Sequence, residues 1–306
     1  FVISAPGAAI DASPQVSTSN AGTFEIESPT ITVAHGPNAG VQDTVYEEDI
    51  ETLSTTGTNV VLRGTGTNTG VTVENIGGEI TGGFGAIELH ATGDNGSVSF
   101  ADPENDSIST TRGNIAMSAG SGGINIGSLE TGEASAVPGQ ITLTTSNGGN
   151  ITAQNLAIRD GWGHAEISAD ASGSLTVAGG VAVGRDAAIE NVPDGADAEA
   201  IVNFNAGGVV SVGAVTAASH GVNTTASTGV TKSHIYINGG ADGAGNVNIN
   251  GNLVATAISA ATGTADATIE IHTPDSVVFA TGVAAPHATG DNGEVDVQEY
   301  FSIRNA

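Results

Sequence analysis

The chain repeats one pattern of strand, tight corner and strand along most of its length. Taking the first apolar residue after each corner as a mark gives spacings of 40, 27, 26, 27, 24, 34, 38, 30 and 18 residues; the marks are Ile31, Val71, Val98, Ile124, Ile151, Leu175, Val209, Val247, Val277 and Val295. A core period near 26 residues with occasional additions is typical of a solenoid whose coils carry some loops. The heptapeptide HATGDNG occurs at residues 90–96 and 287–293, and we expect it to form the same kind of corner on two coils.

Residues within each unit alternate between apolar and polar, as in Val247 and Ile249 against Asn246, Asn248 and Asn250. This alternation predicts strands with one buried face. About 26 residues can run around three short faces and return one strand spacing, about 4.8 Å, further along. We therefore expect an all-β fold: a right-handed parallel β-helix of about nine or ten coils with a length of about 45 Å along its axis. Asn-Gly and Asp-Gly pairs are typical of hairpins, so a β-sandwich array is the alternative.

The domain organisation follows from where the repeats are regular. We expect residues 1–58 to form the N-terminal coil or coils with an acidic loop insertion, and residues 59–306 to form one continuous domain of β-helix repeats. Acidic insertions at 35–58 and 184–200 are expected to project from the coils, where a solenoid can carry recognition. The only helical pattern, VYEEDIETL at 45–53, is explained equally well by a loop or a single turn.

Charge and composition exclude several classes of partner. The net charge is −27, with 33 acidic residues and six Lys and Arg, so nucleic acid and anionic membrane surfaces are not expected partners. The absence of cysteine excludes disulfides and thiolate metal sites. No apolar run reaches the length of about 18 residues that membrane insertion needs. The chain opens on Phe1 rather than on methionine or a signal peptide, so we interpret it as a processed or excised piece of a longer protein.

Three units resemble the repeats of filamentous-haemagglutinin-like bacterial exoproteins, the large surface adhesins secreted by the two-partner route: GNITAQNLAI at 149–158, GSLTVAGGVAV at 173–183 and GNVNINGNLVATA at 245–257. The resemblance covers about residues 59–285. It implies a β-helical shaft of a secreted adhesin at the cell surface, with other surface proteins or glycans as partners. The family's secretion domain carries Asn-Pro-Asn motifs, which this chain lacks, so the segment resembles shaft and leaves the export route open.

Two other functions stay open beside the adhesin. Identical subunits could stack end to end into an extracellular filament or matrix, because the open ends of a β-helix are unpaired edges. A polysaccharide-degrading enzyme is the third possibility. A uronate lyase needs clustered basic residues, and a hydrolase needs two carboxylates about 5 to 9.5 Å apart. Aligned units instead place Glu88 over Ala116 and Thr142, and Glu270 over Tyr236, so we expect no enzyme and no catalytic residue.

Candidate ligands are few, and we expect neither a cofactor nor a metal site. We interpret His90 and His287 as outward strand-end residues beside a turn rather than as ligands of one ion. Calcium is the open alternative, at the corner residues Asp94, Asn95, Asp291 and Asn292 or at GGADGAGN, residues 239–246, although turn chemistry alone explains these sequences. Trp162, within RDGWGHAE at 159–166, is either an exposed anchor for a glycan or partner, or a cap that fills a gap under a loop.

Overall fold

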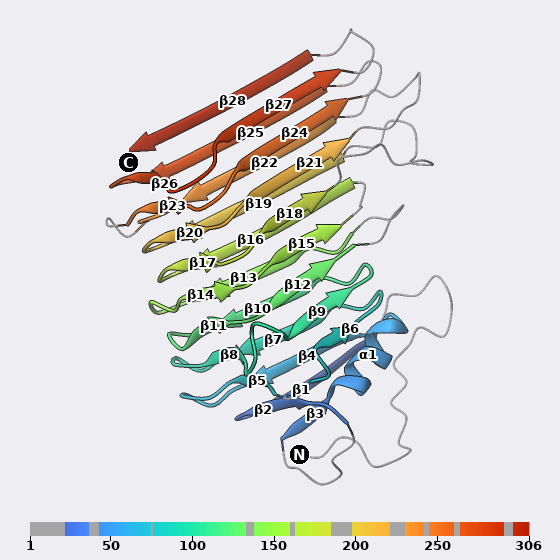
Figure 1. Ribbon diagram of the computed structural model, residues 1–306. Coiled ribbons are helices and arrows are strands. Elements are labelled where there is room, and N and C mark those ends of the chain that lie inside the picture. Colours follow the sequence, from blue (N-terminus) through green and yellow to red (C-terminus); the bar gives the residue numbers. More distant parts are fainter. Residues whose placement is uncertain are drawn as a thin grey trace.

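Three sheets of parallel strands run along the whole molecule, one beside the other (Figure 1). The computed structural model describes residues 22–36, 43–74, 76–132, 138–159, 163–184, 198–220, 230–241, 245–259, 264–290 and 296–305. Sheet 1 contains β1 (Thr23–Ser28), β4 (Asn59–Gly64), β7 (Ile87–Ala91), β10 (Ile115–Ala119), β13 (Ile141–Thr145), β16 (Gly163–Ala171), β19 (Ala198–Ala206), β22 (Val230–Asn238), β25 (Thr264–Thr273) and β28 (Asp296–Asn305).

The other two sheets complete each coil. Sheet 2 contains β2 (Ile31–Ala34), β3 (Thr44–Tyr46), β5 (Val71–Glu74), β8 (Ser97–Phe100), β11 (Gly123–Asn125), β14 (Ile151–Ala153), β17 (Leu175–Val177), β20 (Val210–Val212), β23 (Val247–Ile249) and β26 (Val277–Phe279). Sheet 3 contains β6 (Glu79–Thr81), β9 (Ser107–Thr110), β12 (Ser128–Thr131), β15 (Leu156–Arg159), β18 (Val181–Gly184), β21 (Val215–His220), β24 (Leu253–Ser259) and β27 (Ala284–Gly290). The chain visits sheets 1, 2 and 3 in turn, so the predicted parallel β-helix is confirmed.

The register of sheet 2 follows the sequence marks almost throughout. Eight of them stack in one inward column: Ile31, Val71, Val98, Ile124, Ile151, Leu175, Val247 and Val277. The mark at Val209 is wrong, because Val210 and Val212 are the residues whose side chains are buried and Val210 pairs with Leu175. Alternation along the strand, rather than the first apolar residue, sets the inward face. The mark at Val295 lies outside the described residues.

The core consists of stacked columns of aliphatic side chains. In one column of sheet 1, Leu143, Ala169, Phe204 and Ile237 follow one another on β13, β16, β19 and β22, and each is completely buried. The small Ala169 side chain lies beside the large Phe204 ring on the next coil. The ring therefore fills core space that the alanine leaves, and the two coils share that space.

Asparagine side chains join one coil to the next. Their carbonyl oxygens accept backbone N–H groups of the following coil over 2.8 to 3.1 Å, in the pairs Asn59 with Ala86, Asn114 with Gln140, Asn150 with Ser174, Asn155 with Gly180 and Asn252 with Val283. These bonds satisfy amides at the sharp bends, where the strand ladder is interrupted.

A helix covers the first strand of sheet 3. Helix α1 (Glu47–Thr55) buries Ile50 and Leu53, and Glu47 lies with two other acidic residues in its first turn, where the helix dipole favours negative charge. Its Ser54 Oγ accepts the N–H of Gly83 at 2.9 Å, beside the edge of β6. The expectation of a projecting acidic loop is therefore wrong for residues 43–58, because an amphipathic helix shields a strand edge there. Of the second acidic insertion, residues 185–197 lie outside the described residues.

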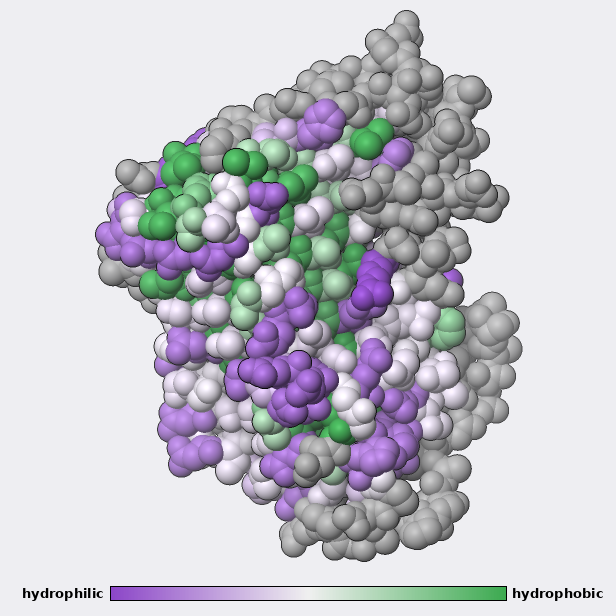
Figure 2. Space-filling model, in the orientation of Figure 1, coloured by the Kyte–Doolittle hydropathy of each residue, from purple (hydrophilic) through white to green (hydrophobic). Residues whose placement is uncertain are grey.

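The last strands of the three sheets lie at the opposite end (Figure 1). Val278, Val283 and Ile303 expose 46%, 62% and 46% of their surfaces there. Figure 2 shows green, apolar surface gathered toward this end. Pro286 occupies β27. Since Leu253 N–H donates to Val283 O, parallel pairing directs the nitrogen of Pro286 away from β24.

Candidate functional site

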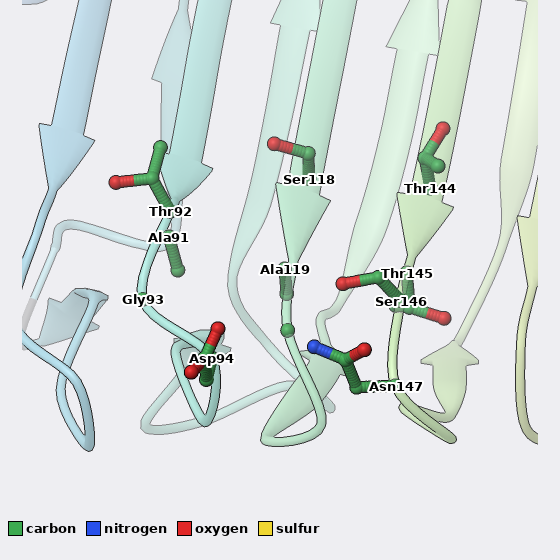
Figure 3. A pocket seen from close by; sticks show the side chains of 11 residues that line it. Ala91, Thr92, Gly93, Asp94, Ser118, Ala119, Thr144, Thr145, Ser146 and Asn147 are labelled. Carbon is green, nitrogen blue, oxygen red and sulfur yellow. The ribbon is translucent and has the colours of Figure 1, made fainter.

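A hollow of about 250 Å³ opens where β7, β10 and β13 turn from sheet 1 toward sheet 2 (Figure 3). Small inward residues at the strand ends, such as Ala91 and Ala119, leave this corner shallow. Polar side chains line it on three consecutive coils: Thr92, Asp94, Ser118, Thr144, Ser146 and Asn147. Such a wall of hydroxyl and amide groups suits a small polar solute.

Asp94 and Asn95, two of the residues considered for a calcium site, make different contacts at this hollow. Asp94 lines the hollow, whereas the Asn95 amide donates to Asn68 Oδ1 at 2.9 Å and accepts from Ser121 Oγ at 2.6 Å. Asp94 is the only carboxylate among the lining residues. Asp291, Asn292 and residues 242–244 of GGADGAGN lie outside the described residues, so calcium stays the open alternative.

The two HATGDNG sequences begin on strands of different sheets, and residues 291–293 of the second copy lie outside the described residues. His90 lies on β7 of sheet 1, and the chain continues to β8 of sheet 2, whereas His287 lies on β27 of sheet 3, opposite Thr256. The two copies therefore do not share one position in the coil, and whether they form the same kind of corner stays a prediction. Both histidines lie on strands, in different sheets and six coils apart, which is too far for them to share one ion.

Three strands of sheet 1 carry a glutamate and a histidine two positions apart on the outer face. The histidine Nε2 lies 3.0, 3.0 and 3.4 Å from the glutamate Oε2 in the pairs Glu88 with His90, Glu166 with His164 and Glu270 with His272. Residues two apart on a strand project to the same side, so the sequences ELH, HAE and EIH contain the signal. Sequence reasoning considered His90 with His287, and Glu88 and Glu270 as carboxylates, and missed the pairing of each glutamate with a histidine two positions away.

His164 also connects two coils. Its Nδ1 lies 2.7 Å from Glu199 Oε2 on β19, while Nε2 contacts Glu166 on its own strand. Burial opposes the charged imidazole, and the hydrogen bonds with Glu199 and Glu166 outweigh it, so the pKa of His164 is raised. When protonated, the ring bridges two carboxylates that would otherwise repel each other.

Three rings gather on β22 and β25. Tyr236 lies with its centroid 6.3 Å from that of His234, edge to face, and 5.1 Å from that of His272. His234 Nε2 is buried and has no hydrogen-bond partner among the described residues. Burial first, and then the charge of Lys232, lowers the pKa of His234, so this imidazole is neutral near pH 7.

The carboxylate positions agree with those expected from the aligned units. Glu88 pairs with Ala116, and Glu270 pairs with Tyr236 on one side and Ser302 on the other. The neighbouring strands thus place no second carboxylate directly beside Glu88 or Glu270, as a paired acid and nucleophile would need.

A cluster that sequence reasoning missed lies at the start of α1. His35 Nδ1 contacts Glu47 and lies 3.4 Å from Glu48 Oε1, and the three ligand atoms lie within 4.8 Å of one another. Backbone N–H groups of Gly77 and Gly36 also donate to Glu47 and Glu48, respectively. The hydrogen bond with Glu47 raises the pKa of His35. The set could hold a divalent cation, but with His35 protonated it acts as a clamp between α1 and the chain before it.

Trp162 lies outside the described residues, so its two interpretations stay open. Among the described residues, no helix has the length and apolar character needed to cross a bilayer. Comparisons of the chain with protein-family models, with curated proteins and with solved structures found no match.

Proposed function

We propose that this chain is the stiff, adhesive shaft of an extracellular surface protein. The observation that carries the proposal is the continuity of sheet 1, whose ten strands stack in register from β1 to β28. Nine steps of about 4.8 Å give a rod of about 43 Å in which each coil is fixed by its neighbours. Such a rod holds groups at fixed intervals without disulfides, and the chain contains no cysteine.

The outer surface also fits an adhesive role. One outward column of sheet 1 carries a charged or hydrogen-bonding side chain on every strand: Glu27, Arg63, His90, Ser118, Thr144, Asp170, Asn205, Asn238, His272 and Arg304. An enzyme needs one concentrated site, whereas this column distributes polar groups along the axis. The resemblance to filamentous-haemagglutinin-like repeats supports the same role and an extracellular, cell-surface location.

A self-assembling filament is the second candidate. The exposed Val278, Val283 and Ile303 favour it, because apolar side chains at a strand edge promote joining. Helix α1 opposes head-to-tail stacking, because it covers the β6 edge at the other end. A filament would therefore have to displace this helix or join like ends.

Bead adhesion tests the shaft proposal. Beads coated with the purified chain should attach to bacterial and epithelial cells more than beads coated with a globular protein of similar negative charge. Electron microscopy of the same preparation should show separate short rods. Equal attachment of both bead types would contradict the adhesive role, and continuous fibres would favour the filament.

A further inference from the structure

The ring cluster on β22 and β25 offers a stacking surface. Tyr236 is partly exposed between two imidazole rings, and the three rings occupy neighbouring outward positions of sheet 1. Rings with an apolar face and a polar edge provide large contact area at low conformational cost. The apolar face of a sugar ring fits such a surface, while its hydroxyls remain available for hydrogen bonds.

A chain of amides lies beside the rings. Asn238 Nδ2 donates to Asn205 Oδ1 at 3.3 Å, and Asn205 Nδ2 donates to Asn203 Oδ1 at 3.2 Å. These bonds fix the amide planes but involve neither the Asn203 N–H groups nor the Asn238 carbonyl oxygen. A donor and an acceptor held at set positions suit hydroxyl groups, which both donate and accept. Because the amides are already ordered, binding costs little side-chain entropy.

His234 contributes its ring rather than a hydrogen bond to this surface. Its Nε2 is buried with no partner among the described residues, a condition that usually costs free energy. The lowered pKa keeps the ring neutral, so Nε2 either donates or accepts according to the tautomer. A nitrogen with no accessible surface does not reach a ligand on the outer face, so this neutral ring contributes contact area beside Tyr236.

Charge and spacing define the occupant. Glu199, Asp266 and Glu270 face outward around Lys232, so carboxylates outnumber cations on this part of the sheet, and the whole chain carries −27. Anionic polymers are therefore repelled. The polar groups recur on each coil at about 4.8 Å, which favours an extended, repetitive ligand.

We propose that the outer face of β19, β22 and β25 binds a neutral linear polysaccharide that crosses the strands along the axis of the β-helix. Tyr236 stacks on a sugar ring, and the Asn203 N–H groups and the Asn238 carbonyl oxygen bind its hydroxyls. This inference rests on the proposed adhesive function and names the receptor class for it.

Affinity electrophoresis and calorimetry test the proposal with the full chain. Laminarin, dextran and galactomannan serve as neutral probes, and alginate serves as the anionic control. At least one neutral polysaccharide should bind with an affinity that is insensitive to added salt, and alginate should not bind. Tyr236→Ala should weaken binding about tenfold, which equals about 1.4 kcal/mol.

Two further variants keep the test specific. Asn205→Ala should weaken binding about threefold to tenfold, because it releases the Asn203 and Asn238 amides that Asn205 holds in place. Asn248→Ala, on β23 in sheet 2, changes the same residue type on another face and should bind like the unchanged chain. Binding by alginate alone, no binding by any neutral probe, or unchanged binding by both Tyr236→Ala and Asn205→Ala would overturn the site.

The bead assay separates this site from the adhesive function. Attachment of beads without binding of any neutral polysaccharide would leave the adhesive function and remove the site. Binding of a neutral polysaccharide in solution without attachment of beads would leave the site and remove the adhesive function.

Discussion

Replacing Phe204 by alanine should open a cavity within the column of β16, β19 and β22. The ring is completely buried between Ala169 and Ile237, and neither neighbour can extend into the vacated space without moving its strand. Removing a buried phenylalanine costs about 3 to 5 kcal/mol. At about 2 °C per kcal/mol for a chain of this size, the melting temperature should fall by about 6 to 10 °C.

The damage should also be local, because the stability of a solenoid is close to a sum of coil and interface contributions. Hydrogen exchange followed by mass spectrometry should speed up in β16, β19 and β22 before the β1 to β7 region changes. Ala169→Leu alone should overpack the column by about 1 to 3 kcal/mol. Combined with Phe204→Ala, the leucine should fill part of the cavity, so the double variant should be more stable than the sum of the single effects.

Thr216→Ala on β21 is the matched control, since this side chain is outward and partly exposed. Its effect should stay within about 0.5 kcal/mol. Strict additivity of Ala169→Leu and Phe204→Ala, or a loss below about 1 kcal/mol for Phe204→Ala, would refute the idea that neighbouring coils share the core volume.

Three further changes test other contacts. Asn155→Ala removes an oxygen that accepts Gly180 N–H at 2.9 Å, and should lower the free energy of unfolding in urea by about 1 to 2 kcal/mol. Folding raises the pKa of His164 above 6.5. The stabilisation from protonated His164 is therefore complete below pH 6.5 and is lost as the pH rises through the pKa of the folded state. His164→Gln should flatten this pH dependence in melting curves from pH 6 to 8. Ile50→Asp should detach α1 from the end of the β-helix and increase aggregation in light scattering, since it buries a charge without a partner.

Each of these changes has a contradictory outcome. Asn125→Ala, on the exposed side of β11, should be nearly neutral; an effect equal to that of Asn155→Ala would show that the inter-coil bond contributes nothing specific. Identical pH curves for His164→Gln and the unchanged chain would remove the bridge from the stability argument. Thr52→Asp, on the exposed side of α1, should not aggregate; aggregation equal to that of Ile50→Asp would attribute the effect to charge rather than to the cap.

The fold could be predicted because its information is local and periodic. Alternation as in Val247 and Ile249 sets the inward face, and the distance between marks sets the coil. The error at Val209 arose where two valines follow one another, so the first apolar residue was not the inward one. The helix at Glu47–Thr55 had visible signals, an acidic first turn with Ile50 and Leu53 behind it, but the need to cover β6 is a tertiary cause that no local pattern contains.

The candidate site was predictable only in its register. Tyr236 was expected to lie over Glu270, and the pairing confirms it, because both strands alternate regularly. The amide chain through Asn205 depends on side-chain rotamers, which the alignment of units does not determine. The unpartnered nitrogen of His234 depends on burial by its neighbours, which is likewise a property of the packed structure.

Pro286 resembles a chain terminator in polymer chemistry. Each strand that adds to a β-helix hydrogen-bonds the outward N–H and C=O groups of the strand before it. Pro286 has no N–H group, so β27 lacks one donor on its outer edge. A strand that pairs with the outer edge of β27 therefore makes one hydrogen bond fewer than it would with any other residue at position 286. An incoming strand therefore pairs best with this edge if it carries a bulge opposite Pro286.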